Sequence, residues 1–259
     1  MMIDQEVLDA ANRYSQETGS KADLHEDDYI LKFLLENPCF PSKSESVRYY
    51  FEDGRKSAGQ FSRLLVNELK LDPSTAEVLE FACGYGCLTR HLVGSDAVPN
   101  VVCSDIHEQA NEFQGRVFGV PTIQSTVMPE HYPTTAGFDV VFCLSFFSHM
   151  PPSSWPRWLE VLFNQVRPGG FLVFTTHGAA SRVHFSNPTI PESGIWFRTE
   201  SEQQDLDTAD YGQSIVDFHY VLRQIDERLS KAGGSLHLLR PGYWWEHQDL
   251  YVVRSAPAS

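Results

Sequence analysis

Residues 76–94 constrain the fold more than any other stretch of the chain. The apolar run Val78–Phe81 has the composition of a short strand, and Gly84 and Gly86 interrupt it soon afterwards. Apolar residues at helical spacing follow, namely Leu88, Leu92 and Val93. The order strand, glycine turn and helix predicts a ligand-binding turn, because glycine takes positive φ and its missing Cβ admits a ligand to the backbone. The helix would point unpaired N–H groups at that ligand.

The residues around the turn separate two classes of cofactor. A nicotinamide dinucleotide site favours G-x-G-x-x-G, but Thr89 stands at the third glycine position. Glu80 lies four positions before Gly84, where a carboxylate repels a pyrophosphate and suits a cationic ligand with an amino group. Asp105 lies 21 positions after Gly84 and follows the apolar run Val101–Cys103. A carboxylate there reaches ribose hydroxyls, and little structural role is expected for it.

These residues resemble a known family. The segment Glu80-Phe-Ala-Cys-Gly-Tyr-Gly86 resembles the first motif of the class I S-adenosylmethionine-dependent methyltransferases, and Ser104-Asp105 resembles their ribose-binding acid. Ala82 stands where the family often has glycine, a departure that alters the turn but keeps the glycine pair. A distant stretch, Arg167-Pro-Gly-Gly-Phe171, is similar to the family's junction between a helix and the fifth strand. The resemblance covers about residues 76–254.

The alternation of strand and helix patterns from residue 76 onward predicts an α/β fold. With the resemblance, it implies a seven-stranded, mostly parallel, Rossmann-like methyltransferase sheet with helices on both faces and an antiparallel last strand. Strands are expected at 78–82, 101–104, 122–124, 138–144, 171–176, 236–239 and 249–253. Further helices are expected at 27–35, 47–69, 107–117, 153–166 and 217–231, with Gly54 and Gly59 as candidate breaks in the second.

Two regions extend this core. Residues 1–75 form an expected N-terminal helical extension to a methyltransferase domain at 76–259. The extension either covers the cofactor, as the resemblance implies, or packs on the sheet, and Tyr29, Tyr49 and Tyr50 fit both roles. Residues 177–214 form an insertion after strand five, with a short strand at 195–197. Since the carboxyl end of that strand faces the ligand crevice, we expect a substrate-side lid or wall, with a solvated loop as the alternative.

Charge and cysteine usage narrow the partners. Lys and Arg total 20, Asp and Glu total 34, and the net charge is −14, so nucleic acid and anionic membrane are poor candidate partners. The chain lacks both a secretory signal pattern and the ~20-residue apolar run of a membrane span. Its five cysteines form no C-x-x-C pair, and no metal site is expected. We therefore expect a cytoplasmic protein with reduced thiols, whereas the oligomeric state is not predicted.

Ligands of open α/β sheets bind beyond the carboxyl ends of the strands. Reading those ends in the light of the resemblance gives the candidate S-adenosylmethionine site: Glu80, Ala82, Gly84, Gly86, Asp105, Ile106, Ser125, Thr126, Val127, Leu144 and Ser145. The resemblance implies that Glu80 faces the methionine amino group and Asp105 the ribose. Ile106 and Val127 are expected either to enclose the adenine or to belong to the core. Ser125 or Thr126 would bond the adenine amino group, and Leu144 and Ser145 would lie near the sulfonium.

Methyl transfer from a sulfonium is an in-line displacement that depends mainly on alignment and exclusion of water, and S-adenosylhomocysteine is the product. A base is needed only when the acceptor loses a proton. His149 and His177 follow strand ends and are the candidate bases, or they order their loops. The sequence thus predicts a methyltransferase of small molecules, with oxygen favoured as acceptor atom. A silent binding domain and, third, a nicotinamide oxidoreductase are the alternatives.

Overall fold

The computed structural model describes residues 3–94, 98–135, 137–201 and 203–258. The chain divides into two compact units. Unit 1 comprises Met1–Ala76 and Cys83–Gln124, and unit 2 comprises Glu77–Ala82 and Ser125–Ser259. The N-terminal helices therefore share a unit with the glycine turn. The division into an extension and a domain at residue 76 stays a prediction.

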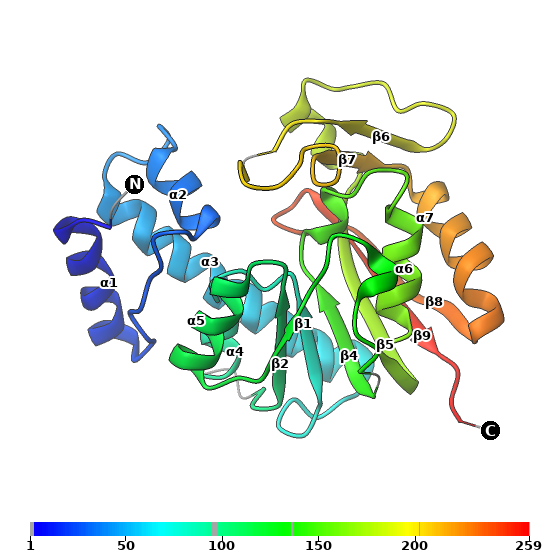
Figure 1. The fold of residues 1–259 in the computed structure, drawn as a ribbon, viewed down its shortest axis with the longest axis horizontal. Coiled ribbons are helices and arrows are strands. Elements are labelled where there is room, and N and C mark those ends of the chain that lie inside the picture. The colour runs from blue at the N-terminus through cyan, green and yellow to red at the C-terminus, as the bar shows by residue number, and fades with distance from the viewer. Residues whose placement is uncertain (1–2, 95–97, 136, 202, 259) are drawn as a thin grey trace. The chain divides into compact units, whose positions relative to one another are not determined.

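The chain forms a seven-stranded sheet of order β3-β2-β1-β4-β5-β9-β8 (Figure 1). Its strands are β1 (Val78–Phe81), β2 (Val101–Asp105), β3 (Thr122–Gln124), β4 (Phe138–Cys143), β5 (Val166–His177), β8 (Gly234–Trp244) and β9 (Gln248–Ser255). Strand β9 is antiparallel to both of its neighbours, whereas β1 and β4, β2 and β3, and β4 and β5 pair in parallel. The predicted mostly parallel sheet is thereby confirmed. Strand order reverses at β1 and β4, the point where open α/β sheets bind ligands.

Three capped helices open unit 1: α1 (Gln5–Thr18), α2 (Tyr29–Glu36) and α3 (Lys43–Leu64). Their N-terminal N–H groups donate to the side chains of Asp4, Asp28 and Ser42, the residue types that favour helix starts. The sequence analysis did not predict α1. Its buried face packs with α2 and α3 in one cluster: Val7, Ala10, Ala11, Tyr14, Leu31, Leu34, Val47, Tyr50 and Phe51.

Gly54 and Gly59 were candidate breaks in the predicted helix, but α3 runs through both. A Cβ at Gly54 would lie 2.0 Å from the carbonyl oxygen of Cys87. The glycine therefore lets the helix approach the backbone that follows Gly86, and close packing rather than helix termination explains this residue.

Two further helices of unit 1 flank the glycine turn. The helix that follows the turn, α4, has only four residues, Thr89–Leu92, and no side chain caps its start. The N–H groups of Arg90 and His91 donate to the carbonyl oxygens of Gly86 and Leu88, so they are not among the unpaired helix N–H groups that the sequence predicted. Helix α5 (Glu108–Phe118) begins after His107 and ends at Gly119, which has φ 74°.

Unit 2 places its helices after β4 and before β8. In α6 (Trp155–Phe163) the predicted apolar stripe is buried, as expected of core: Trp155, Trp158, Leu159, Leu162 and Phe163. The helix ends earlier than predicted, because Val166 pairs with Phe138 and Arg167 forms an ion pair with Asp139. Residues 166–170 thus belong to β5. Helix α7 (Phe218–Gln224) continues through a π-helical turn, Ile225–Leu229, and a 3₁₀ turn, Ser230–Ala232.

The insertion after β5 carries a small sheet of its own. After a 3₁₀ helix at Ala180–Phe185, strand β6 (Ile195–Arg198) pairs antiparallel with β7 (Gln213–Val216). In Figure 1 these two strands lie at the top of the view, and they form a separate two-stranded sheet. The sequence analysis predicted β6 but missed β7. Its use as a lid or wall stays a prediction.

Strand β8 is longer than predicted. It runs to Trp244, and the chain reverses through Trp245 and Glu246, whose φ angles are 49° and 61°. The segment expected to join the last two strands is therefore mostly strand. Within the residues that the structure describes, none of the helices combines the length and apolar composition that a bilayer crossing requires.

Candidate functional site

The two positions of the turn in unit 1 require glycine for different physical reasons. Gly84 has φ 53° and Gly86 has φ 82°, the left-handed region that favours glycine. A Cβ at Gly86 would lie 2.4 Å from the Phe118 ring, so Gly86 is required by packing. A Cβ at Gly84 would meet no atom within 4 Å. Gly84 thus leaves its backbone open to a ligand, which fits the close approach expected of a nucleoside cofactor.

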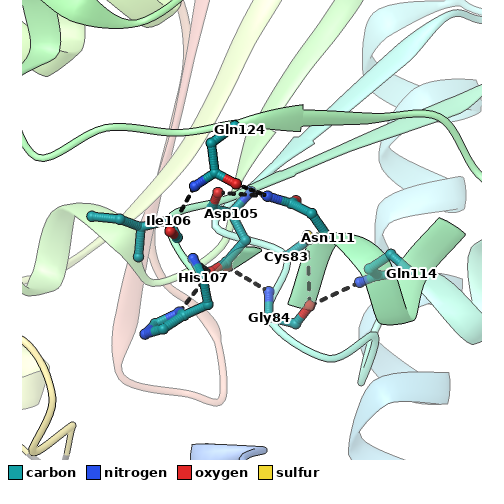
Figure 2. Close-up of polar contacts among 8 residues, drawn as sticks. All are labelled: Cys83, Gly84, Asp105, Ile106, His107, Asn111, Gln114 and Gln124. Atoms are coloured by element: carbon teal, nitrogen blue, oxygen red, sulfur yellow. Dashed lines mark hydrogen bonds and ion pairs between the residues drawn. The ribbon is translucent and has the colours of Figure 1, made fainter. Parts of the chain in front are cut away.

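Asp105 holds the turn, contrary to the expectation of little structural role. Its Oδ2 accepts a hydrogen bond from the Gly84 N–H at 2.8 Å (Figure 2). Its Oδ1 accepts from the His107 N–H at 2.9 Å and lies 2.8 Å from His107 Nδ1. An ionised carboxylate has about four acceptor positions. Asp105 therefore has capacity for a further donor such as a ribose hydroxyl, in a turn that it has itself shaped.

Two amide side chains on α5 fix Asp105 and Gly84 from the other side. Asn111 accepts from the Asp105 N–H at 3.1 Å and donates to the Asp105 carbonyl oxygen at 2.9 Å. Gln114 donates to the Gly84 carbonyl oxygen and to Thr89 Oγ1, both at 3.0 Å. Figure 2 shows both amides directed at the turn. The sequence analysis missed them, although polar residues three apart on the buried face of a helix are a usable signal.

Arg90 anchors the N-terminal segment of unit 1 at the turn. The buried guanidinium donates to the carbonyl oxygens of Gly86 at 2.9 Å, Lys21 at 2.9 Å and Asp23 at 3.0 Å. Tyr85, between the two glycines, stacks on His25 with ring centroids 4.5 Å apart. The segment before α2 therefore lies on the turn itself.

The three tyrosines that the sequence left open differ in exposure. Tyr50 is buried and donates to Asp28 Oδ2 at 2.6 Å. Burial, with Asp28 adding to it, raises the pKa of Tyr50 well above its usual value. Tyr50 thus belongs to the core. Tyr49 is exposed, and the Tyr29 ring lies 6.0 Å from that of His107.

In unit 2, the candidate residues at the end of β1 contrast in burial. Glu80 is buried, and its register partner on β4 is Phe142. Ala82 is exposed and has φ 58°. An L-residue in this region costs about 1–2 kcal/mol. The strain explains physically why glycine suits this position better than alanine.

The remaining cofactor candidates lie as follows. In unit 1, Ile106 is half-buried, and its carbonyl oxygen accepts from Gln124 at 2.7 Å. In unit 2, Ser125 is buried and Val127 is 53% exposed, so Val127 is not core. Thr126 donates to the Met128 carbonyl oxygen at 2.8 Å. Leu144 and Ser145 are half-buried just after β4, and Ser145 has φ 62°.

The two candidate bases lie near each other in unit 2, with ring centroids 6.5 Å apart. His149 Nδ1 lies 2.8 Å from the Gly212 carbonyl oxygen. A carbonyl oxygen only accepts, so Nδ1 carries the hydrogen and Nε2 is the acceptor nitrogen of the neutral ring. Tyr211 stacks on the ring at 4.4 Å with an interplanar angle of 5°. His149 is therefore oriented by both hydrogen bonding and stacking.

The His177 ring is neutral near pH 7. Burial lowers its pKa to about 3, with the neighbouring His149 and His247 contributing in the same direction. Its buried Nδ1 has no hydrogen-bond partner among the described residues. Across those same residues, no group of three or more His, Cys, Asp or Glu side chains could hold a metal ion.

Comparisons with known proteins agree with this geometry. A family model described as a methyltransferase domain matches residues 52–242. No curated protein sequence matches the chain significantly.

Solved structures with a similar fold include two named methyltransferases and a protein in complex with S-adenosylhomocysteine. Magnesium protoporphyrin IX methyltransferase from Synechocystis with bound S-adenosylmethionine has 12% identity and TM-score 0.52, covering 99% of this chain and 100% of that one. The DhpI complex with S-adenosylhomocysteine has 18% identity and TM-score 0.52, covering 89% and 97%. The sugar N-methyltransferase KedS8 from Streptoalloteichus has 16% identity and TM-score 0.52, covering 80% and 88%.

The family model spans the glycine turn, Asp105, both histidines and most of the seven-stranded sheet. The match favours methyl transfer over the nicotinamide-dependent oxidoreductase. The chain therefore belongs to the class I S-adenosylmethionine-dependent methyltransferase family, and S-adenosylmethionine is its cofactor.

Proposed function

We propose that this methyltransferase transfers a methyl group to a hydroxyl oxygen of a small molecule and that His149 removes the hydroxyl proton. The observation that carries the proposal is the hydrogen bond from His149 Nδ1 to the Gly212 carbonyl oxygen, at 2.8 Å. It leaves Nε2 as the ring nitrogen able to accept a proton. When bound, S-adenosylmethionine supplies the electrophilic methyl group.

His177 takes a different part in this proposal. With a pKa of about 3, it is too weak a base to hold a proton near neutral pH. Its neutral ring, beside that of His149, instead forms part of the wall that the acceptor molecule contacts. The ring spacing of 6.5 Å allows a small polar group to meet both histidines.

The cofactor contacts follow from the residues at each strand end. We assign the ribose hydroxyls to Asp105, whose carboxylate keeps an acceptor position. The cofactor passes close to the backbone at Gly84, where no side chain obstructs it. Glu80 offsets the positive methionine amino group. The adenine lies against Ile106 and Val127, whose exposed side chain is available for such a contact, and bonds Ser125 or Thr126. Ala82, Gly86, Leu144 and Ser145 complete the proposed set near the turn and the sulfonium.

A small acceptor agrees with what the similar structures are named for, since one of them is a sugar N-methyltransferase. Because that name specifies nitrogen, the acceptor atom must be tested directly. The net charge of −14 disfavours a polyanionic acceptor such as nucleic acid.

The test uses S-adenosylmethionine with an isotopically labelled methyl group, incubated with the purified protein and mixtures of small phenols, alcohols and amines. Mass spectrometry identifies the labelled product and the methylated atom. We expect an O-methyl product whose formation falls about 10²–10⁴-fold in His149→Gln. His219→Gln is the matched control, since His219 is an exposed histidine of the same unit. Products labelled only on nitrogen, or a His149→Gln rate equal to that of the control, would overturn the proposal, and no product at all would favour the silent binding domain.

A further inference from the structure

We infer that Gln248 is a positioning residue, which holds the turn between β4 and His149 and so sets the orientation of the His149 ring. The inference rests on the proposed function for its catalytic meaning. Gln248 is the first residue of β9 and is 2% exposed. Its backbone pairs with His177 on β5 and with Trp244 on β8. One buried residue thus lies beside both the β5 strand end and the turn after β4.

The side chain of Gln248 belongs to a closed, directional series of hydrogen bonds. The Ser145 N–H donates to Thr175 Oγ1 at 2.8 Å, and that hydroxyl donates to Gln248 Oε1 at 2.6 Å. Gln248 Nε2 donates to Ser145 Oγ at 2.8 Å. Ser145 is therefore bound twice, through its backbone and its side chain, and both bonds pass through Gln248 or its direct partner.

The series continues from Ser145 toward His149. With its acceptor position used by Gln248, Ser145 Oγ is left to donate to Ser148 Oγ at 2.8 Å, and Ser148 Oγ donates to the Ser145 carbonyl oxygen. The turn closes where the His149 N–H donates to the Phe146 carbonyl oxygen at 3.0 Å. Every hydroxyl in the series donates once and accepts once. The direction is fixed at the backbone ends, because the Ser145 N–H only donates and the Ser145 carbonyl oxygen only accepts, and the Gln248 amide joins the two ends.

The backbone of Ser145 needs such support. Its φ of 62° is one that L-residues keep only where the surroundings hold them. On the other side of the turn, Gly212 binds His149 through both its carbonyl oxygen and its N–H, the latter to the His149 carbonyl oxygen at 2.9 Å. If Gln248 is lost, the two Gly212 bonds still hold His149, and Trp155 Nε1 and Ser214 Oγ still donate to the Phe147 carbonyl oxygen, but Ser145 loses its side-chain support.

A purely structural role is the alternative, and Gln165 provides a matched control. Gln165 is also 2% exposed and accepts from the Thr135 N–H at 2.9 Å and from Thr135 Oγ1 at 3.1 Å. It directly precedes β5, at the amino end of the strand, whereas Gln248 pairs with His177 at the carboxyl end. Loss of either amide removes buried hydrogen bonds, but only loss of Gln248 touches the His149 turn.

The experiment compares Gln248→Met and Gln165→Met, which keep the side-chain length, in the full chain without added ligand. Thermal unfolding is expected to shift down by several degrees in both. Amide hydrogen exchange should accelerate at least tenfold at Ser145 to His149 in Gln248→Met and stay unchanged there in Gln165→Met. In ¹⁵N spectra of labelled histidine, the fraction of His149 protonated at Nδ1 should fall only in Gln248→Met.

Gln248→Glu sharpens the test, because an ionised carboxylate accepts from Thr175 but donates nothing to Ser145, whereas the protonated acid does both. Protection of the Ser145 to His149 amides from hydrogen exchange, relative to the parent at the same pH, should therefore recover as the pH falls below the pKa of the introduced carboxyl. Equal exchange and equal His149 spectra in Gln248→Met and Gln165→Met would overturn the inference. Failure of the proposed function would show instead in the methyl-transfer rate of His149→Gln, which these measurements do not use.

Discussion

The glycine turn of unit 1 and the histidine-bearing strand ends of unit 2 are both fixed by glutamine side chains, but the bonded residues are much farther apart in the sequence in unit 2. Each holds a backbone position of positive φ with a buried glutamine: Gln114 binds Gly84, and Gln248 binds Ser145. The partners lie 30 residues apart in the first case and 103 in the second. The turn is thus a local device with a readable motif, whereas the histidine region is assembled from distant segments.

The two regions also differ in charge. The turn is shaped by the Asp105 carboxylate, which accepts hydrogen bonds from the N–H groups of Gly84 and His107. In the histidine region, burial lowers the pKa of His177 to about 3, so that ring is neutral. An anionic group suits the ribose hydroxyls of the cofactor, which donate hydrogen bonds. An imidazole suits an acceptor molecule that must lose a proton.

The largest expected effect separates the two glycines of the turn. Gly86→Ala places a methyl group 2.4 Å from the Phe118 ring at φ 82° and should lower the free energy of unfolding by about 3–5 kcal/mol. Gly84→Ala meets open space and should cost only about 1 kcal/mol, but its methyl group should weaken cofactor binding. Urea unfolding and calorimetric titration with S-adenosylhomocysteine measure the two effects. Equal loss of stability in both variants would contradict this account of the turn.

Asp105→Asn should have the next largest effect. The amide keeps the shape of the side chain but places donors against Gly84 N–H or His107, and it loses charge-assisted bonds worth about 1.5–3 kcal/mol each. We expect S-adenosylhomocysteine to bind about 10²-fold more weakly. Asp139→Asn is the control, because Asp139 is equally buried and accepts from the Glu77 N–H at 3.0 Å. A comparable loss of affinity in the control would mean that Asp105 acts only through stability.

Acid should destabilise both units through buried histidines. Burial lowers the pKa of His91 in unit 1 to about 4 and that of His177 in unit 2 to about 3, with Arg90 and His149 as the next contributors, respectively. The unfolded chain binds a proton near pH 6.5, so stability is present above that pH and is lost as the pH falls toward the folded values. Each histidine should cost about 2 kcal/mol between pH 8 and pH 5.

Urea unfolding at the two pH values measures this loss. His91→Leu and His177→Asn should each remove about one histidine's share of the pH dependence. A pH dependence unchanged in both variants would show that neither ring is held neutral by the fold.

The smallest effect concerns Ala82. Replacing it with glycine relieves the strain at φ 58° but adds freedom to the unfolded chain, so stability should rise by less than about 1 kcal/mol. Thermal unfolding of Ala82→Gly measures this difference. A clear loss of stability would show that the turn tolerates alanine without strain.

The sequence predicts the parts of the fold that depend on neighbouring residues. Strand β3 is found at the predicted residues 122–124, and α5, at Glu108–Phe118, is shifted by one residue from the predicted 107–117. Helix α1 was missed because its burial depends on α2 and α3, and β7 because its pairing depends on β6. Gly54 was misread since its reason is contact with Cys87, 33 positions away.

The same limit applies to the candidate site. Glu80 and Asp105 lie near the carboxyl ends of β1 and β2, Gly84 follows β1, and all three could be named from local pattern alone. Asn111, Gln114, Thr175 and Gln248 are single polar residues whose partners are set by the tertiary fold. No spacing rule joins Ser145 to a residue 103 positions later, so these positioning groups required the structure.

The central claim is that the Asp105 region determines cofactor affinity and the His149 region determines the transfer step. The most direct test is calorimetric titration of S-adenosylhomocysteine into the parent, Asp105→Asn and His149→Gln. The account predicts about 10²-fold weaker binding in Asp105→Asn and an affinity within about twofold of the parent in His149→Gln. Parent-like binding in Asp105→Asn, or an equally large loss in His149→Gln, would contradict it.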